Sequence, residues 1–439
     1  MQPPGSNQHG SGLPGSKRLW RNRPILAWAF YDWANSAFSL LVVTAFVPLM
    51  LGGFWNDGAA SPLTTFRLGV GNGIASAVVV LLAPLLGAMT DRAGRRKPWL
   101  AAFTALGVLA TVGLAAVGPG GWPLAMVCFV LGSIGFFAAN SLYDALLIDV
   151  SPPASYDRVS ALGYALGYLG SALLFVLSIA MLVQPERFGF ASAVASIRFS
   201  FLLVALWWAV FTLPLLFWVR ERSTERAPAS GGLRAGFRQL YRTVQAVRGQ
   251  PELLRFLIAY WLYIDGVYTI IKMAVDYGLS QGLSSTDVTG AIMLTNLIGF
   301  PAAIGFGMLG DRLGARRGIY LALAIYIVAT TAAVFLRTAT DFYVLAITIG
   351  LVQGGVQSLS RSLYARLIPA ESRGEYFGFY NMMGKFSSIV GPVLAGTAAL
   401  LSGSQRIGIL SILLLFAAGL WLLSRVRLPA EAETAGPGA

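Results

Sequence analysis

Six polar or charged side chains lie inside long apolar segments, where ionised groups are rare. They are Asp32, Asn35, Asn140, Asp144, Asp265 and Lys385. A charged side chain at such a depth costs about 2.5 kcal/mol or more unless it faces a water-filled cavity or a partner of opposite charge. Side chains of this kind can bind a charged solute or carry a proton, so we treat these six as candidate substrate and coupling residues.

Asp32 lies about seven residues into the apolar segment 25–53, or about 10 Å deep at 1.5 Å per residue. Asn35 follows one turn later on the same helix face and would add a second polar contact. Asp32 could carry a coupling proton or balance a substrate ammonium. Alternatively, it could hydrogen-bond Asn35, Ser36 or a neighbouring helix and only fix the packing. We favour the functional interpretation.

Asn140 and Asp144 are four residues apart near one end of the segment 122–149, so they share a helix face. The corresponding segment of the second half of the chain carries Arg361 and Arg366 instead. An ion pair between Arg361 and either Asp32 or Asp144 would close one end of a pathway. We favour this gating role over direct contact with the substrate.

Lys385 lies about ten residues into the segment 375–402, too deep to extend easily to the membrane surface. It could hold a substrate carboxylate and, with Asp32, would offer the two opposite charges that a zwitterion needs. An ion pair with Asp265, which lies in the middle of the segment 253–280, or with another acid would explain it equally well.

The sequence contains one cysteine, Cys128, and one histidine, His9. These two residues exclude a disulfide framework, a zinc cluster and a Ser-His-Asp triad. Gly305-x-Gly307-x-x-Gly310 matches a dinucleotide-binding pattern, but it lies in an apolar segment without a preceding strand, so close helix packing explains it better. We therefore expect no enzyme and no cofactor, with the proton as the one possible coupling ion.

These residues are positioned by an all-α membrane protein. Of the 439 residues, 56% are hydrophobic and only 12% are charged, and the mean hydropathy is +0.68. A soluble domain carries about 25% charged residues. Because a spanning helix needs about 20 apolar residues, the sequence predicts twelve transmembrane helices, at 25–53, 68–90, 98–118, 122–149, 159–183, 198–219, 253–280, 287–310, 318–336, 341–366, 375–402 and 405–425.

The formal net charge of +13 comes from an excess of basic residues, and membrane topology explains where these residues lie. Twenty-five of them flank the predicted helices on the side of the termini, and only five lie on the other side. The positive-inside rule places both termini in the cytoplasm. We expect a multi-pass protein of the bacterial cytoplasmic (inner) membrane, with the lipid bilayer as its surroundings, no nucleic-acid partner and a monomeric functional form.

The two halves of the chain repeat each other, which indicates two pseudo-symmetric six-helix bundles. Gly87-x-x-x-Asp91-Arg92 is repeated by Gly307-x-x-x-Asp311-Arg312, and Ser141-Leu142-Tyr143 by Ser362-Leu363-Tyr364. Trp28 with Asp32 matches Trp261 with Asp265. The expected organisation is a disordered cytoplasmic tail (1–19), an N-terminal bundle (20–219), a cytoplasmic linker (220–252), a C-terminal bundle (253–426) and a C-terminal tail (427–439).

The run Gly87-x-x-x-Asp91-Arg92-Ala93-Gly94-Arg95-Arg96 and its repeat resemble the loop signature of the major facilitator superfamily. Tyr31–Phe38, Gln357–Pro369 and Glu375–Asn381 resemble the narrower "unknown major facilitator" family, which includes the autophagy-related amino-acid effluxers of fungal vacuoles. The resemblance implies the major facilitator fold. It also implies that the loop stabilises one conformation by meeting the start of the eleventh helix. The gating candidates are therefore Arg361, from its expected ion pair, and the residues of the loop and its repeat, namely Gly87, Asp91, Arg92, Gly94, Arg95, Arg96, Asp311 and Arg312.

Together these observations predict a secondary active transporter that works by alternating access on a small polar solute. The resemblance implies an amino acid or a related zwitterion, possible efflux and possible proton coupling. A lipid or drug flippase on the same fold, which would open laterally, and a non-transporting membrane receptor remain alternatives.

Overall fold

The computed structural model describes residues 21–56, 61–93, 95–221, 241–369, 372–387 and 390–427. Over these ranges the chain forms helices joined by short connections, and it forms no strand. In lipid, a helix satisfies its backbone hydrogen bonds within one segment, whereas an open sheet edge would leave polar groups unpaired. The all-α fold class predicted from the sequence is confirmed.

Six helical units form the N-terminal half. The first unit runs from Arg23 to Trp55 and contains π-helical turns, which are uncommon and often occur near functional sites. Its parts are α2 (Arg23–Ala37), η1 (Phe38–Phe46), α3 (Val47–Met50) and η2 (Leu51–Trp55). The other units are α4 (Ser61–Ala93), α5 (Lys97–Ala116), α6 (Trp122–Ala145) with α7 (Leu147–Val150), α8 (Tyr156–Val183) and α9 (Ala193–Trp218), together with the short 3₁₀ turns η3 (Pro153–Ser155) and η4 (Pro185–Phe188).

Six further units form the C-terminal half, and two of them are interrupted. The uninterrupted helices are α11 (Pro251–Ser280), α12 (Ser285–Leu313), α13 (Ala315–Ala333) and α14 (Ala339–Leu367). The last two units are divided into α15 (Arg373–Phe386) with α16 (Val390–Ser402), and α17 (Gln405–Ser411) with α18 (Leu413–Ser424).

In the described part of the chain, twelve helical units therefore occupy the twelve predicted spans. Within the described residues, nine helices are long and apolar enough to cross a membrane by themselves. The other three predicted spans coincide with α4, α13 and the pair α15–α16. Two of these three are too short in apolar sequence to cross a membrane by themselves. Their apolar stretches are Phe66–Val79 in α4 and Val390–Ser402 in the divided unit.

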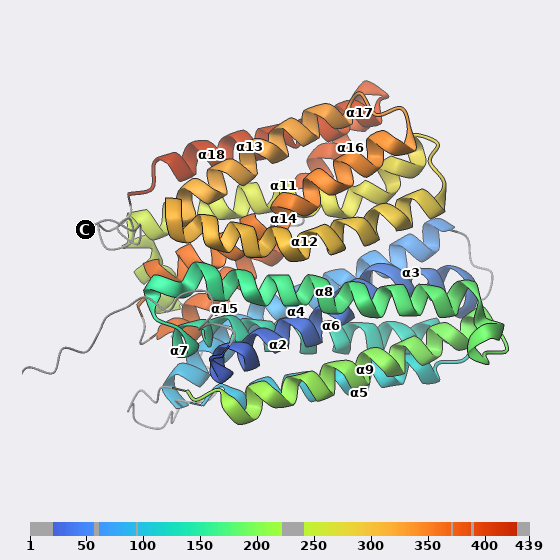
Figure 1. Ribbon diagram of the computed structural model, residues 1–439, viewed down its shortest axis with the longest axis horizontal. Coiled ribbons are helices and arrows are strands. Elements are labelled where there is room, and N and C mark those ends of the chain that lie inside the picture. Colours follow the sequence, from blue (N-terminus) through green and yellow to red (C-terminus); the bar gives the residue numbers. More distant parts are fainter. Residues whose placement is uncertain are drawn as a thin grey trace, which may run out of the picture.

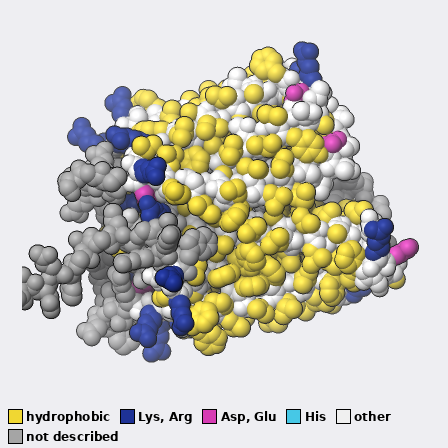
Figure 2. All heavy atoms as spheres, in the orientation of Figure 1, with side chains coloured by type: hydrophobic (Ala, Val, Ile, Leu, Met, Phe, Trp, Pro, Cys, Tyr) yellow, Lys and Arg dark blue, Asp and Glu magenta, His cyan; other side chains and the backbone are white. Residues whose placement is uncertain are grey.

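The surface of the molecule is that of a membrane protein. Figure 2 shows hydrophobic side chains over the middle of the face in view, with Lys and Arg gathered toward its two ends. Large apolar side chains face outward far more than in a soluble protein; Leu206 is 61% exposed, Phe217 75% and Val328 67%. Such a continuous apolar surface is stable only when it is covered by lipid.

The two halves pack side by side. In Figure 1 the C-terminal half lies above the N-terminal half, except for α15, which is seen lower, beside α4. At their junction α8 packs against α12, and α4 packs against α15. We call the end of the molecule where α4, α6 and α12 finish and α5, α8 and α15 begin the basic end, because it carries Arg95, Arg96, Lys97, Arg158, Arg312, Arg316, Arg317, Arg366 and Arg373.

Glycines on both sides of the junction allow this close packing. A Cβ atom on Gly87 would lie 2.6 Å from the backbone nitrogen of Glu375, in the first turn of α15. A Cβ atom on Gly307 would lie 2.5 Å from Ala161 Cβ at the start of α8. Gly87 and Gly307 are equivalent in the two repeats. Each thus allows a helix of its own half to pack closely against a helix of the other half.

The predicted N-terminal tail (1–19), the predicted C-terminal tail (427–439) apart from Arg427, and most of the predicted linker lie outside the described residues. Within the linker, residues 241–248 are helical, and Val247 is buried in a hydrophobic cluster that contains residues of both halves.

Candidate functional site

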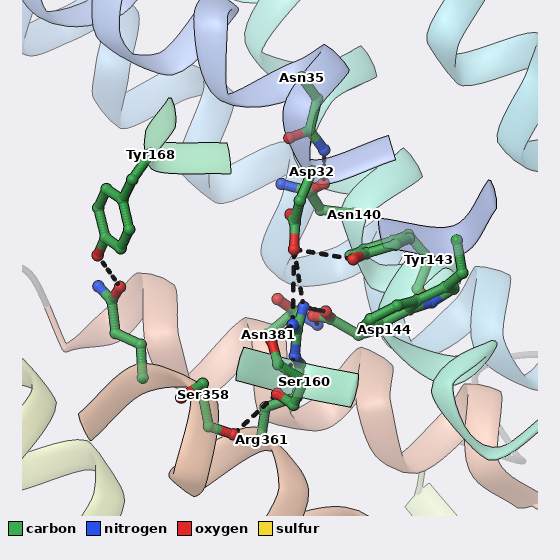
Figure 3. Close-up of polar contacts among 12 residues, drawn as sticks. Asp32, Asn35, Asn140, Tyr143, Asp144, Ser160, Tyr168, Ser358, Arg361 and Asn381 are labelled. Atoms are coloured by element: carbon green, nitrogen blue, oxygen red, sulfur yellow. Dashed lines mark hydrogen bonds and ion pairs between the residues drawn. The ribbon is translucent and has the colours of Figure 1, made fainter. Parts of the chain in front are cut away.

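A buried arginine joins the two halves. Arg361 lies on α14 of the C-terminal half, two turns from the basic end, and only 2% of it is exposed. Its guanidinium crosses the junction and donates hydrogen bonds to the N-terminal half: Nε to Ser160 Oγ at 2.9 Å and Nη2 to the Ser160 carbonyl oxygen at 2.8 Å. Figure 3 shows the side chain surrounded by residues of both halves.

Asp144 forms the shorter of the two ion pairs made by Arg361. Its Oδ1 lies 2.9 Å from Arg361 Nη1. Its other oxygen accepts a hydrogen bond of 2.9 Å from Asn381 Nδ2 on α15. Asp144, on α6, therefore contacts two different helices of the C-terminal half.

Asp32 forms the second ion pair, with a longer distance. Its Oδ2 lies 3.4 Å and 3.5 Å from the two terminal nitrogens of Arg361, and it accepts a hydrogen bond of 2.8 Å from the Tyr143 hydroxyl. Asp32 can reach this position because α8 has no side chain at Gly163, where a Cβ atom would lie 2.6 Å from Asp32 Oδ2. The pairing of Arg361 with Asp32 and Asp144 that we considered from the sequence is thus present in the structure.

Aromatic rings enclose the guanidinium on its remaining sides. Its central carbon lies 4.4 Å from the ring centroid of Tyr164, 4.9 Å from that of Trp28 and 5.5 Å from that of Tyr143. Cations within about 6 Å of an aromatic face are attracted by the ring. Trp28 stacks on Tyr143 and donates a hydrogen bond to its carbonyl oxygen at 3.0 Å, which holds both rings in place.

Two uncharged hydrogen-bonded pairs lie one helical turn further from the basic end than the Arg361 cluster. One joins two side-chain amides, and the other joins a phenol and an amide. Asn35 donates to Asn140 within the N-terminal half, so two predicted site residues meet. Across the junction, the Tyr168 hydroxyl donates to Gln357 Oε1 at 3.0 Å. Neither pair carries a charge, and Asn140 and Tyr168 are only half-buried, so these groups could exchange partners with a polar solute.

A second layer of ion pairs lies nearer the basic end. Arg366 on α14 pairs with Asp157 of α8 at 2.8 Å, and Ser362 also donates to Asp157. Arg373 at the start of α15 pairs with the buried Asp149 of α7 at 2.6 Å. This layer, like the pairs of Arg361, joins the halves and so favours a conformation in which the basic end is closed.

The predicted gating residues fall into three groups. Asp311 on α12 pairs with Arg158 at the start of α8, and Arg96 lies 3.7 Å from Asp149. Arg95 and Arg312 are exposed at the basic end. Gly94 and the side chains of Asp91 and Arg92 lie outside the described residues, so the expected contact of that loop with the start of α15 rests here on Gly87 alone.

Asp265 is not part of the Arg361 cluster in the described part of the chain. Asp265 is buried on α11, accepts hydrogen bonds of 3.0 Å from the Gly391 backbone nitrogen and is 3.3 Å from Thr269 Oγ1. A carboxylate at the first turn of α16 offsets the partial positive charge of that helix end. Lys385 belongs to α15, but its side chain lies outside the described residues, and its pairing with Asp265 stays a prediction.

Several residues of the cluster were missed from the sequence. Asn381 and Gln357 lie inside segments used for the family resemblance, and Trp28 belongs to the internal repeat, so each had a signal. Nothing in the sequence distinguishes Ser160 and Tyr164, because serine and tyrosine are common in apolar helices.

Within the described residues, no group of three or more His, Cys, Asp or Glu side chains could hold a metal ion.

The model of the family described as "vacuole effluxer Atg22 like" matches residues 68–153 and 149–436. An uncharacterized MFS-type transporter of Bacillus subtilis (strain 168), YxiO, is 36% identical over 93% of this chain and 95% of its own length. The chain belongs to the Atg22-like effluxer family. This Atg22-like protein is therefore a secondary transporter of the major facilitator superfamily and not an enzyme, and it is an integral, multi-pass membrane protein.

More distant matches agree with this assignment. Autophagy-related protein 22-2 of Aspergillus clavatus is 27% identical over 54% of this chain, which spans only 43% of the fungal protein. The crystal structure of the human organic anion transporter MFSD10 (TETRAN) superposes with a TM-score of 0.72 at 18% identity, covering 92% of this chain and 99% of that one. This structural match confirms the twelve-helix major facilitator fold.

A cavity of about 430 Å³ lies away from the Arg361 cluster, at the opposite end of α8. It is lined mainly by apolar side chains, among them Val176, Val183 and Met293. Its lining provides no carboxylate, and we do not include it in the candidate site.

Proposed function

We propose that this Atg22-like protein exports a small zwitterionic solute, an amino acid or a close relative, in exchange for protons. The name of the family, vacuole effluxer, and the resemblance to fungal amino-acid effluxers support the direction and the solute class. The charges at the junction support a solute that carries charge itself, because an apolar cargo would gain nothing from two buried carboxylates.

The observation that carries this proposal is that one buried guanidinium holds two carboxylates across the junction. A buried ion pair is stable only while both partners are present, because an unpaired buried charge costs several kcal/mol. The Arg361 cluster therefore acts as a gate at the basic end. Anything that neutralises Asp32 or Asp144 weakens the gate, and a proton or a substrate ammonium would do so.

Asp32 is the better proton acceptor of the two carboxylates. Its distances to Arg361, 3.4 and 3.5 Å, are longer than the 2.9 Å of Asp144, so it loses less attraction when it is protonated. Protonated Asp32 could still hydrogen-bond Tyr143. Proton binding to Asp32 would thus break one of the two ion pairs of Arg361 and weaken the gate.

We expect Asp32→Asn to abolish proton-driven flux while solute exchange continues. Asparagine keeps the size of the side chain and can still accept from Tyr143, but it carries no titratable group. Proteoliposomes would be tested for gradient-driven uptake and for counterflow. Glu186→Gln, which replaces an exposed carboxylate in η4 just after the end of α8, is the matched control and should leave both activities unchanged. Loss of both activities in Asp32→Asn, or of neither, contradicts a coupling role.

The orientation follows from the same charges. We propose that the basic end faces the cytoplasm of a bacterial cell, that both termini lie on that side, and that the two six-helix halves move as rigid bodies in a monomer. The concentration of arginines at this end supports the orientation through the positive-inside rule. The structure then corresponds to a state closed toward the cytoplasm.

A further inference from the structure

We infer that the pocket filled by the Arg361 guanidinium is the binding site for the cationic group of the transported solute, a primary ammonium or guanidinium. In this scheme the Arg361 guanidinium occupies the position of the solute's cationic group while the basic end is closed, and it leaves the pocket when that end opens. The inference rests on the proposed transport function and names the part of the solute that this site recognises.

The pocket belongs almost entirely to one half of the molecule. In the described part of the chain, the side chains around the guanidinium come from α2, α6 and α8; they are Trp28, Asp32, Tyr143, Asp144, Ser160 and Tyr164. From the C-terminal half, within the described residues, Arg361 fills the pocket and Asn381 donates to Asp144 at its edge. Movement of α14 away from the N-terminal half would therefore empty the pocket without dismantling it (Figure 3).

The chemistry of the pocket selects a positive, organic group. Two carboxylates and the Ser160 carbonyl oxygen accept hydrogen bonds, and three aromatic rings present their faces within 5.5 Å of the bound cation. An anion would meet two negative charges. A bare metal ion would gain little from the rings compared with its hydration, whereas an ammonium or guanidinium matches carboxylates and rings together.

The balance of charge makes a bound cation necessary when Arg361 leaves. The closed cluster contains two carboxylates and one guanidinium. Without Arg361, Asp32 and Asp144 would face each other in a largely buried site, which is unfavourable for two ionised acids. A proton on one carboxylate, or the cationic group of the solute between the two, would restore the charge of the closed cluster. The site would thus hold either a proton or the solute, as exchange requires, and opening would be coupled to loading.

The inference can be tested by emptying the pocket in the full-length protein. Agmatine carries a guanidinium and no carboxylate, so we would measure its binding to Arg361→Ala in lipid nanodiscs by the shift in melting temperature. We expect a saturable rise, and a loss of affinity of ~10-fold or more when Asp144→Asn is added, since a close charge partner is removed. Arg366→Ala removes an arginine from the same helix whose partner is Asp157, and it should show no such rise.

Agmatine that stabilises Arg361→Ala no more than Arg366→Ala, or sodium ions that stabilise it as well as agmatine, would overturn the inference. If Arg361→Ala does not fold, competition against solute flux in the wild-type protein decides the question. A transported amino acid should compete, and its N-acetylated form should compete at least ~10-fold less well, because acetylation removes the positive charge. Equal competition by both forms overturns the inference while leaving transport itself established; absence of flux for every solute would instead contradict the proposed function.

Discussion

Replacing Arg361 with alanine is expected to abolish net transport and to lower the free energy of unfolding by about 3–5 kcal/mol. The substitution leaves Asp32 and Asp144 buried without their partner, and it also removes the hydrogen bonds to Ser160. Solute flux into proteoliposomes and the thermal stability of the purified protein would measure the two effects.

Two further variants make this result specific. Arg361→Lys keeps the charge but cannot reproduce the planar fork that reaches Ser160, Asp32 and Asp144 together, so it should restore stability only in part and transport hardly at all. Arg317→Ala removes an exposed arginine at the same basic end and should change neither quantity. Near-normal transport by Arg361→Ala would show that the cluster is not a gate.

Gly307→Leu is expected to reduce transport by at least ~10-fold, because it keeps the basic end from closing. A side chain here would enter the start of α8, where even a Cβ atom lies 2.5 Å from Ala161 Cβ and 3.3 Å from the Asp157 carbonyl oxygen. Overpacking of a tight contact commonly costs 1–3 kcal/mol, and a shift of about 1.4 kcal/mol changes the equilibrium between open and closed forms tenfold.

Gly305→Leu is the matched control for this prediction. Gly305 lies two residues away on the same helix, and a Cβ atom there would have no neighbouring heavy atom within 4 Å. Solute flux and the accessibility of the basic end to a cysteine reagent would be compared in the two variants. The same loss of flux in both would indicate a general effect on α12 rather than a blocked closure.

Much of the architecture follows from local features of the sequence. The apolar runs predict twelve helical units because each helix satisfies its own backbone and needs only the right length and composition. The interruption of the eleventh unit between Phe386 and Val390 was not predicted, since the segment 375–402 looks continuous in hydropathy. The cap that Asp265 provides for α16 depends on this interruption, which is why the sequence indicated only a substrate or coupling role for Asp265, or an ion pair with Lys385.

The candidate site could be predicted in part for a similar reason. Asp32, Asp144 and Arg361 stand out because charges in apolar helices are costly, and opposite charges at similar depths suggest a pair. The roles of Ser160, Gly163 and Tyr164 arise from the close approach of α8 to α2 and α14. The residue pattern of a single helix does not reveal which helices it will approach. The roles of the six predicted substrate and coupling residues stay predictions until transport is measured.

The central claim is that the two halves separate at the basic end when the Arg361 cluster opens. Spin labels on Ala154→Cys and Arg317→Cys would report the distance between halves at that end, and labels on Glu186→Cys and Arg337→Cys the distance at the other, in a Cys128→Ser background. We predict that either low pH or transported solute lengthens the first distance and shortens the second, and that Arg361→Ala lengthens the first without either. Two distances that stay constant while solute is being exchanged would contradict the account.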